Sequence, residues 1–111
     1  MELNQYQKRA AATALYPGKG SLAGLTYCAL GLAGEAGEFA NKVKKMIRGD
    51  VSVPLAERHE LLIAELGDIQ WYLAEAAENL GVDLNTVAQK NLEKLAARKA
   101  AGTVRGDGDN R

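Results

Sequence analysis

Apolar side chains recur at helical spacing along most of the chain, and clusters of glycine, proline and polar residues interrupt the pattern at three places. This pattern predicts four helices, which cover Leu3–Leu15, Leu22–Arg48, Leu55–Leu80 and residues 84–101. Ser21 is placed to cap the second helix, and Asp83 the fourth, because a side-chain oxygen there can accept from a free backbone N–H. Gly81 suits the left-handed position that commonly ends a helix.

The two long central helices each carry an apolar stripe at alternating three- and four-residue spacing, which is typical of helices packed in a bundle. The stripes consist of Leu32, Ala36, Phe39 and Val43 on one helix and of Leu62, Leu66, Ile69, Leu73, Ala76 and Leu80 on the other. We expect these stripes to form the core. Trp71 points away from its stripe, which predicts a second covered surface, more readily a subunit interface than a nucleobase pocket.

Two acidic pairs lie beside these stripes. Glu35 and Glu38 are spaced i, i+3, and so are Glu65 and Asp68, so that each pair projects from one helix face. In both segments a glycine separates the acids and an apolar residue follows the second one. If the two helices pack antiparallel, the four carboxylates meet at the seam between them.

Four carboxylates cannot all remain ionised beside a core without a compensating cation. A donor set made only of oxygens favours a hard divalent ion, magnesium or alternatively manganese. Because Mg²⁺ commonly takes its remaining oxygens from a substrate's phosphates, the spacing indicates a metal-dependent phosphate site. The competing interpretation is that these acids are solvated side chains on amphipathic helices. Lys42 and Lys45 continue the acidic stripe and are interpreted as solvated in preference to balancing the acids or touching phosphate.

The motifs Glu35-x-x-Glu38 and Glu65-x-x-Asp68, within "GLAGEAGE" and "ELGDIQWYLA", resemble those of the MazG-like nucleotide pyrophosphohydrolases of the all-α NTP pyrophosphatase superfamily. The resemblance implies an all-α, four-helix MazG-like bundle completed by oligomerisation, as a homodimer or homotetramer with pockets at the subunit seams. It also implies cleavage of a (d)NTP between the α and β phosphates to (d)NMP and pyrophosphate.

The same resemblance assigns roles to individual side chains. Glu35, Glu38, Glu65 and Asp68 would hold Mg²⁺, and Glu35 or Glu38 would accept the proton of the attacking water. Asn91 and Lys94 match family positions that face the phosphates, and a solvated basic face is the equally weighted alternative. Lys94, together with Arg98 or a lysine of a partner chain, would stabilise the leaving pyrophosphate. Apart from the resemblance, Tyr72 is the preferred contact for the base, because it shares a row of its helix with the acids, and Trp71 is the alternative.

Length and composition limit the choices further. The 111 residues predict one domain, with a MazG-like part at 1–101 and a Gly/Asp-rich tail at 102–111 that forms a lid over the substrate or frays. Lys+Arg and Asp+Glu both number 14, which argues against a nucleic-acid polymer or a membrane as partner. The single cysteine, Cys28, excludes an internal disulfide and favours a reducing cytoplasm, and a small buried side chain is its expected role.

Other classes of function remain open at this stage. A di-iron bundle also uses inward-facing acids, but it needs Glu-x-x-His pairs, and the single histidine, His59, forms none. A non-catalytic helical oligomeric interaction module needs no set of four acids. Within the superfamily, a phosphoribosyl-ATP-type pyrophosphohydrolase is a further alternative.

Overall fold

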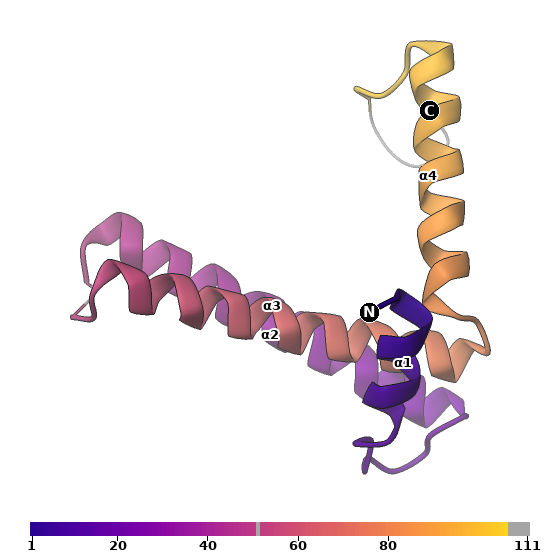
Figure 1. The fold of residues 1–111 in the computed structure, drawn as a ribbon, viewed down its shortest axis with the longest axis horizontal. Helices are drawn as coiled ribbons and strands as arrows, with labels where there is room; N and C mark the ends of the chain where they lie inside the picture. Colours follow the sequence, from indigo (N-terminus) through magenta and orange to yellow (C-terminus); the bar gives the residue numbers. More distant parts are fainter. Residues whose placement is uncertain (51, 107–111) are drawn as a thin grey trace.

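The computed structural model describes residues 1–50 and 52–106. Within these ranges the chain is all-α, as predicted, and contains α1 (Leu3–Ala11), α2 (Leu22–Arg48), α3 (Leu55–Leu80) and α4 (Leu84–Ala101) (Figure 1). Among the described residues, no helix combines the length and the apolar character needed to cross a bilayer. Of the predicted tail at 102–111, the second half, residues 107–111, lies outside the described part of the chain, so the prediction of an ordered lid is not tested.

The ends of three helices follow the local sequence signals. Gly49 and Gly81 adopt positive φ angles of 83° and 70°, which glycine tolerates without steric cost, and they end α2 and α3. The Asp83 side chain accepts from the Thr86 N–H at 2.7 Å, which confirms the predicted cap of α4. Ser21 occupies the N-cap position of α2, as predicted, but its hydroxyl donates to the Gly18 carbonyl and makes no capping hydrogen bond.

Helix α1 is four residues shorter than predicted and ends at Ala11. The Thr13 hydroxyl donates to the Ala10 carbonyl at 2.7 Å, which satisfies an acceptor that a continuing helix would have used. The following loop then brings Tyr16 to α3, where its hydroxyl donates to Glu75 Oε1 at 2.7 Å. This long-range contact explains why local helical preference did not extend α1 to Leu15.

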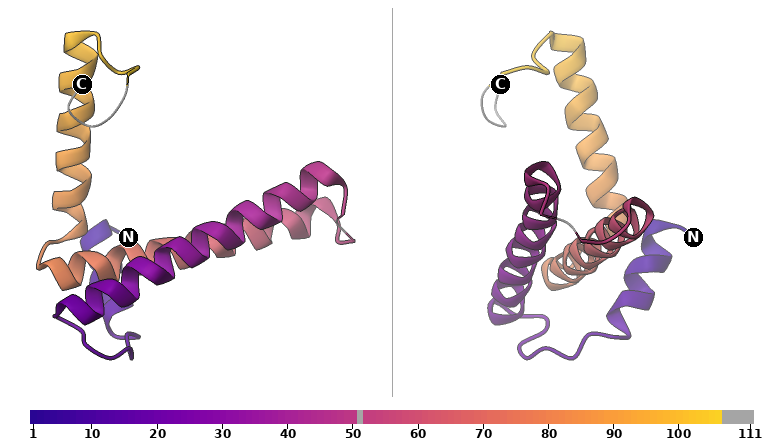
Figure 2. Two further views of the ribbon diagram at one scale, coloured as in Figure 1. Left: turned by 180° about the vertical axis from the view of Figure 1, so that it is seen from behind. Right: turned by 90° about the vertical axis from the view of Figure 1, so that its left-hand side faces the viewer.

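Helices α2 and α3 form a long antiparallel hairpin, with α1 packed on the other side of α3 near the base of the hairpin (Figures 1 and 2). Helix α4 stands away from this hairpin at a steep angle and makes no contact with α2. The radius of gyration is 16.9 Å, whereas about 13 Å is typical of a compact domain of this size. The four helices therefore do not close into a bundle within one chain.

The core that one chain buries is small and lies where α1, α3 and α4 meet. It consists of Ala10, Ala74, Ala77 and Leu84, with Tyr6 and Trp71 packed against it. Trp71 lies at a second covered surface, as predicted, but the start of the same chain provides the cover, and the indole N–H donates to Thr13 Oγ1 at 2.8 Å. Cys28 is fully buried, as predicted.

The predicted core stripe of α3 is only partly buried by its own chain: Leu62, Ile69 and Ala76 are half-buried, and the other three members are exposed. Leu66, Leu73 and Leu80 are 51%, 42% and 63% exposed. The side of α3 that faces α2 is instead the polar row that includes Glu65, Tyr72, Glu75 and Asn79, as their contacts with α2 and its preceding loop show. The stripe prediction identified an apolar face correctly but assigned it to the wrong neighbour.

Glycine allows α2 and α3 to approach this closely. A methyl carbon on Gly31 would lie 2.1 Å from Tyr72 Cε1, so the tyrosine ring occupies the space that any side chain would need. No heavy atom lies within 4 Å of the corresponding position on Gly34. A close approach by this chain's own helix thus explains Gly31, while Gly34 lies on an open face.

Replacing Gly31 with alanine is expected to lower the free energy of unfolding by about 1–3 kcal/mol, because the ring of Tyr72 must move. Urea unfolding followed by circular dichroism measures the change. Gly34→Ala is the matched control, and it is expected to raise the free energy by up to about 1 kcal/mol, because alanine is the better helix former. Equal losses in both variants would contradict this account of the seam.

Candidate metal centre

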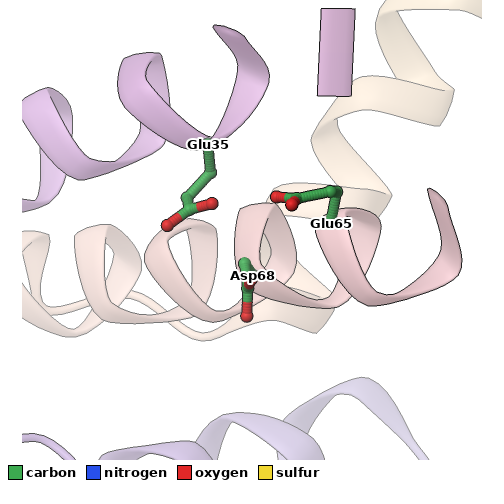
Figure 3. A group of neighbouring side chains, drawn as sticks. All are labelled: Glu35, Glu65 and Asp68. Atoms are coloured by element: carbon green, nitrogen blue, oxygen red, sulfur yellow. The ribbon is translucent and has the colours of Figure 1, made fainter. Parts of the chain in front are cut away.

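Three of the four predicted acids converge at the middle of the α2–α3 seam. Because the two helices run antiparallel, Glu35 of α2 lies opposite Glu65 and Asp68 of α3. One carboxylate oxygen from each lies within 4.8 Å of the others. Figure 3 shows Glu35 projecting from α2 and Glu65 turned toward it from α3. We refer to Glu35, Glu65 and Asp68 as the acidic triad.

Glu38, the fourth predicted acid, does not belong to the acidic triad. Its side chain is 61% exposed, and its Oε2 atom lies 4.0 Å from Lys42 Nζ. Three residues along a helix correspond to somewhat less than one turn, so the same spacing that pairs two acids also separates their directions. The structure therefore places Glu38 at the edge of the cluster.

Lys42 is part of the site, contrary to the interpretation that it is solvated. Its ammonium lies 2.8 Å from Glu65 Oε1 and donates a hydrogen bond to it across the seam. This hydrogen bond lowers the pKa of Glu65 below its ordinary value and raises that of Lys42. The i, i+4 spacing from Glu38 was visible in the sequence, but the partner on α3 could not be identified from it.

The carboxylates of the acidic triad repel one another when they are all ionised. Desolvation and the neighbouring carboxylates of Glu65, Asp68 and Glu38 together raise the pKa of Glu35 above its ordinary value. These causes all disfavour the charged carboxylate. A cation bound between the helices would favour the ionised carboxylate and so lower the pKa of Glu35.

A buried carboxylate oxygen of Glu65 that has no hydrogen-bond partner among the described residues indicates that the acidic triad fits a cation. Lys42 holds one oxygen of Glu65, whereas the other oxygen, Oε2, is buried and has no hydrogen-bond partner among the described residues. A buried oxygen of this kind is costly unless something coordinates it. Carboxylate oxygens alone suit a hard divalent ion such as Mg²⁺ or Mn²⁺. The acidic triad could hold such an ion.

An aromatic cluster lies one turn further along α3 from Asp68. The rings of Tyr16 and Tyr27 are stacked, with centroids 4.8 Å apart and an interplanar angle of 7°. Tyr72 lies 6.2 Å from Tyr27 and 5.0 Å from Trp71. Tyr27 was missed at the sequence level because it lies ahead of the acidic motifs on α2. It is partly exposed, whereas Trp71 packs against the core.

A fully buried carboxylate anchors this cluster to α3. Glu75 Oε1 accepts from the Tyr16 hydroxyl, and it lies 3.4 Å from Lys19 Nζ. Asn79 accepts from the Gly20 N–H at 2.7 Å and donates to the Tyr16 oxygen at 2.8 Å. These bonds fix the loop before α2, and with it the position of the tyrosine rings beside the acidic triad.

The predicted phosphate-binding residues are not near the acidic triad of their own chain. Asn91, Lys94 and Arg98 belong to α4, which projects away from the hairpin and makes no contact with α2 (Figure 1). Asn91 and Lys94 are exposed, whereas Arg98 is buried near the end of α4. A site that combines α4 with the acidic triad therefore needs more than one chain.

Comparison with known proteins identifies the family of the chain. Residues 25–102 match the family model described as the MazG nucleotide pyrophosphohydrolase domain. The chain belongs to the MazG family. It is also similar to the "Gene 37 protein" of Mycobacterium phage L5, with 51% identity over 114 aligned residues and full coverage of both chains. No solved structure matches it.

The residues matched by the family model include the acidic triad but not the N-terminal segment that packs beside it. The MazG domain model covers the acidic triad, Lys42, the α3 aromatics and all of α4. It does not cover α1 or the loop from which Tyr16 and Lys19 reach Glu75. The part that holds the acids is thus shared with the MazG family, whereas the segment that packs Tyr16 onto Tyr27 lies outside the matched region.

Proposed function

We propose that the protein is a Mg²⁺-dependent nucleoside triphosphate pyrophosphohydrolase, which cleaves a (d)NTP between its α and β phosphates to (d)NMP and pyrophosphate. The observation that carries this proposal is the convergence of Glu35, Glu65 and Asp68 within 4.8 Å, with one buried oxygen of Glu65 left without a partner. Membership of the MazG family supports the same class of reaction. Mn²⁺ is an alternative to Mg²⁺, because it accepts the same oxygen ligands.

The acidic triad would hold the metal. When bound there, the ion would neutralise phosphate charge, orient the scissile group and lower the pKa of a water molecule. Glu38 is the better of the two candidate bases, because it lies outside the acidic triad and its carboxylate is exposed. A carboxylate within hydrogen-bond reach of the attacking water can accept its proton during attack on the phosphorus.

The aromatic cluster supports a place for the base of the nucleotide. Tyr72 lies on the same row of α3 as Asp68, and Tyr27 faces it from α2 with part of its surface exposed. A base stacked on these rings would leave its phosphates to extend along the seam toward the acidic triad. We assign Trp71 to packing, because its ring is engaged with the core and with Thr13.

Phosphate contacts from α4 would come from a second copy of the chain. Asn91 and Lys94 are exposed on a helix that leaves its own hairpin, and the apolar stripe of α3 is also uncovered. A homodimer or homotetramer would bury the stripe and could bring α4 of one protomer to the acidic triad of another. Lys94 would then stabilise the negative charge that develops as pyrophosphate leaves.

A nucleotide panel tests the proposed reaction. Canonical and modified (d)NTPs, together with phosphoribosyl-ATP, are incubated with the protein and Mg²⁺, and pyrophosphate release is measured. We expect release from at least one nucleotide, none in excess EDTA and recovery on addition of Mg²⁺ or Mn²⁺. Orthophosphate as the released product would contradict cleavage between the α and β phosphates.

The same panel separates the two remaining alternatives. Release from phosphoribosyl-ATP alone would assign the phosphoribosyl-ATP-type reaction. A non-catalytic interaction module predicts neither pyrophosphate release nor thermal stabilisation by Mg²⁺ together with a nucleotide, whereas a ligand that binds the folded state must raise its stability. The present geometry favours the enzyme, because a module gives no reason for three acids from two helices to converge.

A further inference from the structure

Lys42 occupies an unusual position for a lysine beside a candidate metal centre. Its ammonium lies 2.8 Å from Glu65 Oε1 and 4.0 Å from Glu38 Oε2, so that it sits between a member of the acidic triad and the exposed acid at its edge. The side chain is 31% exposed, which leaves one side of it open to solvent. Lys42 therefore pairs with two of the acids, and its side chain is partly open to solvent.

A lysine in this position must weaken the binding of a divalent ion to the acidic triad, because both are positively charged. The repulsion between an ammonium and a doubly charged ion that share one carboxylate is appreciable even with the screening of bulk water, and it grows at a partly buried seam. A lysine can also leave such a contact easily, because its charge is carried on a flexible four-carbon stem.

The phosphates of the substrate can form a new ion pair with this lysine. A nucleoside triphosphate carries several negative charges toward a site that already contains Glu35, Glu38, Glu65 and Asp68. Lys42 is the cation that the structure pairs with these acids, through Glu65 and Glu38. Its solvent-exposed side gives the ammonium a path away from Glu65.

We propose that Lys42 is an exchangeable counter-ion: it holds Glu65 before the substrate binds, yields that carboxylate to the divalent metal and pairs with the phosphates of the nucleotide. Lys42 thereby weakens binding of the metal alone and strengthens binding of the metal with its nucleotide. Binding of the metal and binding of the nucleotide would therefore strengthen each other. This inference rests on the proposed function, because it takes the acidic triad as the metal site.

The first test measures Mn²⁺ binding to the nucleotide-free protein, from the electron paramagnetic resonance signal of the free ion. We expect Lys42→Met to bind Mn²⁺ at least about tenfold more tightly than the unaltered protein, since even the screened repulsion of water has this magnitude. Lys42→Arg keeps the charge and should stay within about threefold of the unaltered protein. Lys45→Met is the matched control, because it removes the same charge one turn away from the ion pair.

The second test measures binding of a triphosphate whose α–β bridging oxygen is replaced by an imido group, with Mg²⁺ present. Lys42→Met should bind this analogue at least about tenfold more weakly than the unaltered protein, and Lys45→Met should change the affinity less. Circular dichroism melting confirms that each variant is folded.

The outcomes separate this inference from the proposed function. Equal or weaker Mn²⁺ binding by Lys42→Met would overturn the exchange, since Lys42 would then only position Glu65. Unchanged binding of the analogue would overturn the transfer to phosphate. In both cases the unaltered protein still binds metal and nucleotide, so the proposed function stands. If no variant binds either ligand, the proposed function fails as well.

Discussion

Replacing Asp68 with asparagine is expected to lower kcat/KM for Mg²⁺-dependent pyrophosphate release by about 100-fold or more. The amide keeps the shape of the side chain but removes one charge from the acidic triad. Loss of even the groups that support metal ligands commonly costs 10- to 100-fold, so loss of a ligand should cost at least the upper end of this range. Pyrophosphate release at several Mg²⁺ concentrations measures the effect, and added Mg²⁺ should restore part of it.

Glu60→Gln is the matched control for this experiment, because it removes one charge from the same helix at an exposed position outside the acidic triad. Its activity should stay within about twofold of the unaltered protein.

A separate measurement follows the melting temperature with Mg²⁺ and the imido analogue present. The ligands should stabilise the unaltered protein by about 2.7 kcal/mol at a concentration of 100 Kd, and Asp68→Asn should lose most of this gain. Unchanged activity in Asp68→Asn would remove Asp68 from the metal site.

The helices could be predicted well wherever their ends are determined locally. Gly49 and Gly81 end α2 and α3 because a left-handed residue closes a helix, and this signal lies within the end itself. The end of α1 could not be predicted in the same way. It depends on Tyr16 reaching Glu75, which is 59 residues away in the sequence. Local propensity contains no information about such a partner.

The acidic motifs were predicted, but their surroundings were not. Helical spacing placed Glu35 and Asp68 on facing sides of two helices, and the structure brings them together. The same spacing could not show which face of α3 meets α2. Leu66 and Leu73 have the periodicity of a core. The polar row of α3 faces α2 instead, with the ring of Tyr72 packed against Gly31. An apolar period identifies a face to be covered, whereas the covering partner depends on the tertiary arrangement.

Helix α4 illustrates the same distinction. Its boundaries follow from Asp83 and Gly102, but its direction away from the hairpin has no counterpart in the periodicity. Asn91 and Lys94 were chosen by their resemblance to family positions. Within one chain these residues are distant from the acids, so their proposed role depends on how copies assemble.

The exposed apolar stripe of α3 leads to the second large effect. We expect Leu66→Asp to shift the protein from a homo-oligomer to single chains and to lower pyrophosphate release by at least about 100-fold. Burying one leucine contributes about 1.5–3 kcal/mol, and a symmetric interface contains each residue twice. The two leucines lost from a dimer therefore weaken association by at least about a hundredfold, before the cost of burying a carboxylate is added.

Activity should fall with assembly, because the acidic triad and the proposed phosphate-binding residues of α4 do not meet within one chain. Light scattering at micromolar concentration gives the mass, and pyrophosphate release is measured on the same samples. Leu15→Asp is the matched control, since Leu15 is 95% exposed in the loop after α1 and should alter neither quantity. A monomeric mass for the unaltered protein would contradict the assembly. A monomeric Leu66→Asp variant with full activity would show that one hairpin is sufficient, and Asn91 and Lys94 would then have no part in the reaction.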